Sequence, residues 1–315
     1  MSHIGPRRFE LARLIAVVAL WAGAFHGLSR FGVDLLPRAF ARELTLEAYL
    51  ALVHMATLAL GLTASFVLLG EPRRVLALAA PRPAALGYVL ALVPAVFVVA
   101  TGAAFQIAKP TLLAELAHGG LAEVQKNTGE FGRELTGAPS WLAFAWGALV
   151  SPVSEEFFFR GAVFAVVLDA TSFLRATKGE SALSAELLDE GALTRATRAT
   201  VAWLKRGGAA TLLVALVFGL LHHDMPGGLG IVRFVSALGL GIACGLARQA
   251  SASIAAPILV HVAFNALSLA TARRLLVSEM FPMKAGVPTL VAVVAVAATW
   301  AVAVVYLLSS RGKRA

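Results

Sequence analysis

Apolar runs of about twenty residues, separated by polar segments, make up most of this chain. Runs of this length are typical of membrane-spanning helices, whereas a strand of a membrane barrel needs only about ten residues. Spans are predicted at residues 11–28, 46–69, 84–108, 140–168, 209–223, 229–247, 253–271 and 287–309. The pattern therefore predicts an all-α, polytopic membrane protein of about eight transmembrane helices.

The composition agrees with this interpretation. Of the 315 residues, 59% are hydrophobic and 14% are charged, against about 25% charged in a soluble domain. Mean hydropathy is +0.80. The single cysteine, Cys244, excludes an internal disulfide and a metal site built from several cysteines. The net charge is +9, and the basic residues lie between the apolar runs, which favours membrane lipids rather than nucleic acid as partners.

The distribution of Lys and Arg predicts how the chain is oriented. The first run follows Arg7 and Arg8 and lacks a small-x-small cleavage site, so it is expected to remain as a helix. An even number of spans places both termini on one side, where the segments hold 15 Lys and Arg against 9 in the opposite loops. The positive-inside rule then places both termini in the cytoplasm. Abundant Ala, Leu, Arg and Gly are typical of a bacterial protein, so the expected location is the bacterial inner membrane.

Three regions are predicted along the chain. Residues 1–139 would form the N-terminal transmembrane helices with an interfacial segment. Residues 140–275 would form the core that holds the candidate site, and residues 276–315 the last helix and a basic tail. Two polar stretches lie between spans: 109–139 is expected to be an interfacial or capping helix, and 169–207 a solvated connector with an amphipathic helix.

Three charged residues within six positions interrupt the fourth apolar run. A charge at bilayer depth costs at least about 2.5–3.5 kcal/mol, so Glu155, Glu156 and Arg160 are expected to be paired or functional. Helical spacing brings Glu156 and Arg160 to one face in the favourable acid-first order. Glu155 points about 100° away and has no such partner. Pro152 removes a backbone hydrogen bond nearby, which would open the helix to water.

Two further polar groups lie in later spans. His222 follows Phe218 by four residues at the end of a uniformly apolar run. His261 and Asn265 are also four residues apart, which places the imidazole and the amide on one helix face. Together with Glu155 they predict a polar pocket within the membrane. The remaining histidines in or near spans lack such companions and are expected to be structural: His26, His54 and His223.

These residue types suit the hydrolysis of an amide. A Glu and a His can deprotonate a water molecule, while a second His and an Asn donate hydrogen bonds to the oxyanion that forms. Alternatively, a Glu and two His are ligands of catalytic zinc with an open position for water. The chain contains no H-E-x-x-H helix and no G-x-S-x-G elbow, which argues against the common metalloprotease and serine hydrolase designs.

The three motifs, in this order, resemble those of the CPBP family of intramembrane proteases, which includes the type II CAAX prenyl endopeptidases and the Abi proteins. The family motifs are E-E-x-x-x-R, F-x-x-x-H and H-x-x-x-N. In this chain they begin at Glu155, Phe218 and His261. The resemblance covers residues 140 to about 270, and the first three spans contain no motif.

The resemblance implies a role for each motif residue. Glu155 would activate water with His222 as its partner, and His261 and Asn265 would bind the oxyanion. Glu156 and Arg160 would form the supporting pair. The substrate would be a membrane-associated peptide or protein that carries a lipid in the eukaryotic relatives. The catalytic bundle would extend from the fourth to the seventh span.

The competing class is non-enzymatic. A transporter, or an immunity or partner-binding scaffold, can also contain Glu–Arg and His–Asn groups within the membrane. The chain shows no inverted repeat and no matching pair of spans broken by Gly or Pro. These observations favour the hydrolase.

Whether a metal takes part depends on which residues could support its histidine ligands. A zinc site would use Glu155, His222 and His261 as ligands. Histidine ligands usually donate to a neighbouring carboxylate or carbonyl. The acids near these histidines in sequence are Glu156, already assigned to an ion pair, and Asp224, placed at the end of a span. We therefore expect Glu155 and His222 to activate water without an obligatory metal.

Overall fold

The computed structural model describes residues 4–35, 45–81, 83–117, 140–177, 203, 207–223 and 225–272, and every regular element in these ranges is helical. The helices before the motifs are α1 (Ile4–Phe31), η1 (Gly32–Leu35), α3 (Leu46–Leu68), α4 (Pro72–Val75) and α5 (Pro83–Ala117). One unbroken helical stretch then contains α7 (Ser140–Ala143), η2 (Phe144–Val150), α8 (Ser151–Glu156), η3 (Phe157–Val163) and α9 (Phe164–Thr177). The last three helices are α11 (Ala209–Leu221), α12 (Gly227–Ser251) and α13 (Ala255–Ala272).

The all-α prediction is confirmed for the described residues, and the protein is an integral membrane protein. Among the described residues, the helices long and apolar enough to cross a membrane are Glu10–Phe31, Ala48–Leu68, Leu92–Glu115 and Gly227–Ser251. Ala209–Leu221 and Ala255–Leu269 are shorter apolar helices. The predicted last span, 287–309, lies outside the described residues, as do 118–139 and most of 178–206.

Two helices extend beyond their predicted ends. Helix α5 was expected to end at residue 108, but it continues through Pro110 to Ala117. The stretch after 168 was expected to be a connector, but its first nine residues extend α9 to Thr177. Both predicted ends were placed at a polar residue or a proline. A helix that is already several turns long can continue past such a residue, because the backbone hydrogen bonds of the neighbouring turns remain.

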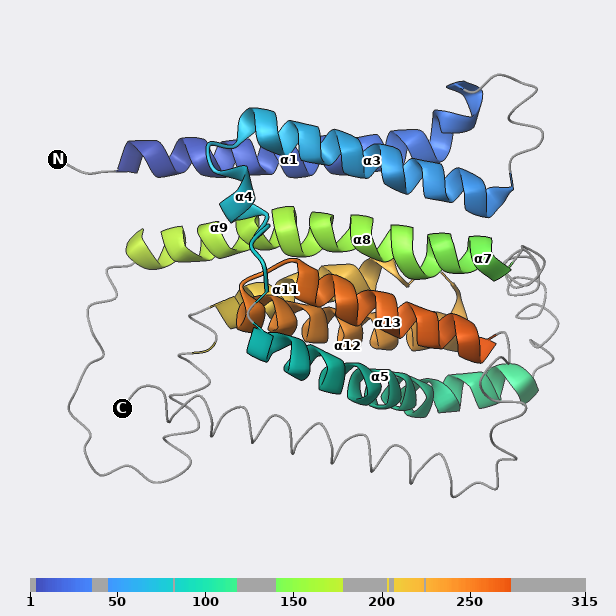
Figure 1. Ribbon diagram of the computed structural model, residues 1–315. Coiled ribbons are helices and arrows are strands. Elements are labelled where there is room, and N and C mark those ends of the chain that lie inside the picture. Colours follow the sequence, from blue (N-terminus) through green and yellow to red (C-terminus); the bar gives the residue numbers. More distant parts are fainter. Residues whose placement is uncertain are drawn as a thin grey trace, which may run out of the picture.

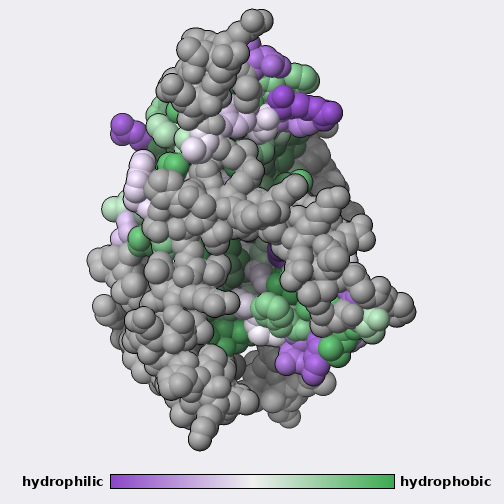
Figure 2. Space-filling model, turned by 90° about the vertical axis from the view of Figure 1, so that its right-hand side faces the viewer, coloured by the Kyte–Doolittle hydropathy of each residue, from purple (hydrophilic) through white to green (hydrophobic). Residues whose placement is uncertain are grey.

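The helices form two groups separated by the stretch 140–177 (Figure 1). On one side α1 packs against α3, and on the other α5, α11, α12 and α13 pack together. Each group has its own apolar core, one around Trp21 and one around Phe218. Phe158 packs against both cores. The stretch with the first motif therefore contacts both groups of helices. Figure 2 looks onto one end of these helices, where hydrophobic and hydrophilic residues both reach the surface.

Small residues allow α11 and α12 to approach closely. A Cβ added at Gly241 would lie 2.9 Å from the Cα of Ala215, and one added at Gly245 would lie 2.6 Å from the Cγ2 of Thr211. Glycines four residues apart occupy one helix face, the usual arrangement for close packing in membranes. This contact brings α11, whose C-cap is His222, against the middle of α12.

Candidate active site

The innermost part of the site is a fully buried ion pair. The Nη1 of Arg160 lies 3.0 Å from Oε1 of Glu156, and both side chains are 0% exposed. The same carboxylate oxygen lies 2.8 Å from Nδ1 of His261. The other terminal nitrogen of Arg160 donates to the carbonyl of Gly241 at 3.2 Å, and the guanidinium lies 4.7 Å from the ring centre of Phe218. Helical i, i+4 spacing creates this pair, and three neighbouring helices then enclose it.

Glu155 faces a different set of partners. Its Oε2 lies 3.9 Å from Nε2 of His261 and 4.0 Å from Nε2 of His222. These separations are too long for direct hydrogen bonds and suit a single bridging atom such as a water oxygen. The Glu155 side chain is 20% exposed and that of His222 is 30% exposed, so this part of the site is open. Oε2 is also buried without a hydrogen-bond partner in the described structure.

Both imidazoles are oriented through their Nδ1 atoms. Nδ1 of His222 lies 2.7 Å from the carbonyl oxygen of Phe218, and Nδ1 of His261 bonds Glu156. A carbonyl can only accept, so Nδ1 of His222 donates. Each ring therefore presents its Nε2 atom to Glu155. The phenylalanine of the second motif thus has two functions: its ring lies against Arg160 and its carbonyl fixes His222.

Asn265 is held one turn from His261. Its Nδ2 donates to the carbonyl of Gly147 at 2.8 Å. Gly147 lies in the π-helical segment η2, where its carbonyl would accept from the amide five residues later. That residue is Pro152, which has no N–H. The proline thus leaves a carbonyl available to an asparagine of another helix.

His54 and Ser151 belong to the site and were missed by the sequence analysis. Ser151 donates a hydrogen bond to Oε1 of Glu155, and its oxygen lies 3.3 Å from Nε2 of His54. His54 was expected to be structural, without companions. The companion is 97 residues away in sequence, so no local motif reveals it. One signal was present: His54 shares a helix face with Thr57, Gly61 and Ser65, a polar and small stripe in an apolar span. Among the other histidines, His223 is exposed at the end of α11.

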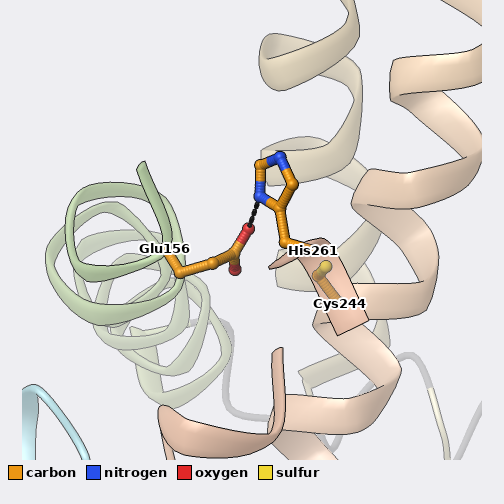
Figure 3. Close-up of side chains that lie close together, drawn as sticks. All are labelled: Glu156, Cys244 and His261. Carbon is orange, nitrogen blue, oxygen red and sulfur yellow. Dashed lines mark hydrogen bonds and ion pairs between the residues drawn. The ribbon is translucent and has the colours of Figure 1, made fainter. Parts of the chain in front are cut away.

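A second cluster near the ion pair contains metal-binding residue types. Glu156, Cys244 and His261 have ligand atoms within 4.8 Å of one another (Figure 3). In this cluster Glu156 and His261 already bond each other, and the thiol contacts the carbonyl of Pro257 at 3.6 Å. A divalent ion here would also be buried beside the Arg160 guanidinium, at a high electrostatic cost. The cluster therefore fits a packed polar core better than a metal centre.

Glu155, His222 and His261 are the alternative ligand set. Oε2 of Glu155 lies 4.0 Å from Nε2 of His222 and 3.9 Å from Nε2 of His261. Two ligands of one zinc ion at about 2.1 Å lie no more than about 4.2 Å apart. These two separations are compatible with zinc and with a bridging water molecule.

Comparison with known proteins agrees with the motifs. Residues 137–267 match the family model described as type II CAAX prenyl endopeptidase Rce1-like. No curated protein and no solved structure matched the chain. The matched segment contains Glu155, the buried ion pair, both histidines and Asn265. The resemblance seen in the motifs is confirmed over residues 137–267, which are similar to the CAAX prenyl endopeptidase family.

Proposed function

We propose that the protein is an intramembrane endopeptidase that cleaves a peptide bond of a membrane-associated protein or peptide. The observation that carries this proposal is the position of Oε2 of Glu155 between the Nε2 atoms of two imidazoles, within a bundle of apolar helices. A partly open carboxylate beside two oriented imidazoles is suited to activating water. The similarity to this family supports substrates that reach the site from the membrane, including prenylated C-termini.

Each polar group has its own role in the proposed reaction. Glu155 accepts a proton from the water that attacks the peptide carbonyl, and His222 helps to hold that water. His261 and Asn265 donate to the oxyanion of the tetrahedral intermediate. Donation from His261 requires hydrogens on both ring nitrogens, and its positive charge would balance Glu155, since Arg160 already balances Glu156. The proton held by Glu155 then moves to the leaving amine.

We propose that no metal is obligatory. Glu156 was expected to be committed to Arg160 and so unavailable to support a histidine. This expectation is wrong, because Glu156 bonds both Arg160 and His261. The proposal rests instead on the two oriented imidazoles, which can hold a water molecule beside Glu155 without a metal. If zinc binds, Glu155, His222 and His261 would hold it, and it would supply Lewis acid chemistry at the same place.

The setting of the site is part of the proposal. Eight spans, with both termini in the cytoplasm of a bacterium and a catalytic bundle from the fourth to the seventh span, would place the site within the inner membrane. The division at residues 139 and 275 would separate this bundle from the N-terminal helices and from the last helix. Membrane lipids would be the permanent partners, and no nucleic acid partner is proposed.

The test is cleavage by purified protein in proteoliposomes. The substrates are a farnesylated peptide ending in a C-a-a-X sequence and the same peptide without the lipid. Wild-type protein is expected to release the three terminal residues, and Glu155→Gln to reduce kcat by about 10²- to 10⁴-fold, since it removes the proton acceptor. Equal cleavage by Glu155→Gln and wild type would contradict the role of this residue. Absence of cleavage of both peptides would contradict the proposed substrate class.

A further inference from the structure

A line of polar contacts leads from Glu155 into the N-terminal group of helices. The hydroxyl of Ser151 donates to Oε1 of Glu155, and Nε2 of His54 lies 3.3 Å from the same hydroxyl oxygen. On the far side of the ring, Nδ1 of His54 lies 2.8 Å from the carbonyl of Leu50. The line thus ends on the backbone of α3, outside the segment that matches the family model.

The donors and acceptors along this line have a defined order. The Leu50 carbonyl can only accept, so Nδ1 of His54 carries a hydrogen. Ser151 has one hydrogen, which it gives to Glu155. Its oxygen accepts from Nε2 of His54 when that ring carries hydrogens on both nitrogens, so this order of bonds requires the imidazolium form of His54. The two carboxylate oxygens of Glu155 therefore have separate environments: Oε1 is bonded within the protein, and Oε2 faces His222 and His261.

The line is buried and surrounded by apolar groups. His54 is 6% exposed and Ser151 is 8% exposed. The edge of the Phe25 ring packs against the imidazole with centroids 5.2 Å apart. Water has little access to compete for these hydrogen bonds, so they hold their geometry better than they would at a surface. Without Ser151, the Glu155 side chain would be free to rotate about its terminal bond and turn Oε2 away from the imidazoles.

We propose that Ser151 and His54 are positioning residues for Glu155. Ser151 fixes the orientation of the carboxylate, and His54 holds Ser151 in place from α3. This inference rests on the proposed function, because it assigns the two residues to the orientation of the carboxylate that activates water. It also gives the N-terminal helices, which contain no family motif, a direct part in the site.

The first test measures orientation without catalysis. The infrared carboxylate stretching band of Glu155 is obtained as the difference between wild type and Glu155→Gln. Ser151→Ala is expected to shift this band, because Oε1 loses its hydrogen bond. The matched control is Ser154→Ala: Ser154 is a buried serine of the same helix, and its hydroxyl donates to the backbone carbonyl of His54 at 3.3 Å. An unchanged band in Ser151→Ala, or an equal shift in Ser154→Ala, would overturn the proposal.

The second test uses kinetics on the farnesylated peptide. Ser151→Ala and His54→Phe are each expected to lower kcat by about 10- to 100-fold, the usual effect of losing a group that orients a catalytic residue, with KM little changed. The double variant should be no worse than the more impaired single variant, because both changes break one line. Thr57→Val is the control on α3, since Thr57 is buried one turn from His54 and bonds the backbone carbonyl of Val53 at 2.8 Å.

Conservative variants separate positioning from packing. Ser151→Thr keeps the hydroxyl, and His54→Gln keeps a donor near the position of Nε2. Both variants should retain most of the wild-type kcat. This expectation holds even if Ser151→Ala and His54→Phe fold poorly. Equal losses in Ser151→Thr and Ser151→Ala would show that the hydroxyl is irrelevant and overturn the inference. If wild type cleaves neither peptide but Ser151→Ala still shifts the infrared band, the proposed function fails while the positioning of Glu155 stands.

Discussion

Two neighbouring carboxylates occupy opposite environments in this protein. Glu156 faces the interior of the bundle, where Arg160 and His261 bond one of its oxygens and its side chain is 0% exposed. Glu155 faces the two Nε2 atoms of His222 and His261, and its side chain is 20% exposed. One step along a helix rotates a side chain by about 100°, and this rotation alone separates the two environments. The difference supports the proposal that Glu156 is the structural and Glu155 the chemical position of the Glu-Glu motif.

The largest effect is expected from removing one partner of the buried ion pair around Glu156. Glu156→Ala and Arg160→Ala each leave an unpaired buried charge, which costs about 3–5 kcal/mol. We expect less folded protein in membranes and a lower midpoint of unfolding in detergent. Glu155→Gln is the matched control and should fold like wild type. A well-folded, inactive Glu156→Gln together with an active Glu155→Gln would show that the two roles are reversed.

A somewhat smaller effect is expected from the loss of Asn265, a proposed oxyanion donor. Asn265→Ala removes an amide donor proposed for the oxyanion, which costs about 10²- to 10³-fold in kcat. Gln249→Ala is the control, because its amide also makes a bond between helices, to Thr211, away from the motif residues. Steady-state kinetics on the farnesylated peptide measures both. Similar losses in the two variants would indicate that Asn265 acts through packing and not through the oxyanion.

Much of the fold and part of the site follow from local patterns. The apolar run 209–223 corresponds to α11 (Ala209–Leu221), because hydrophobic length alone determines such a helix. The pair of Glu156 with Arg160 also follows from spacing within one helix. The contact of Ser151 with His54 does not, since it depends on how α3 packs against a helix 97 residues later. The bond from Asn265 to Gly147 likewise needed the π-helical register of η2, which sequence periodicity did not predict.

A moderate effect is expected where the helices that enclose the ion pair touch. A Cβ at Gly241 would lie 2.9 Å from the Cα of Ala215 and 3.3 Å from Nη2 of Arg160, so Gly241→Ala is expected to destabilise by about 1–3 kcal/mol. Gly23→Ala is the control, because a Cβ there meets nothing within 4 Å. Denaturant unfolding in detergent measures the difference. Equal stability of the two variants would contradict the close approach of α11 and α12.

The smallest effect is expected from metal removal. Treatment with a strong chelator should leave cleavage unchanged, because the proposed mechanism activates water with Glu155 and His222. Bound zinc is measured per chain in the same samples, and a mock-treated sample is the control. Activity that disappears on chelation and returns with stoichiometric zinc would make Glu155, His222 and His261 ligands and would reassign the environment of Glu155 as a metal centre.

The local nature of the buried ion pair has a consequence for biosynthesis. Glu156 and Arg160 lie on one helix, so they can neutralise each other before α11, α12 and α13 have been synthesised. A helix that entered the bilayer with both charges unpaired would incur about 2.5–3.5 kcal/mol for each. The pair thus eases the insertion of its own helix. The later helices then close around a group that is already electrically neutral.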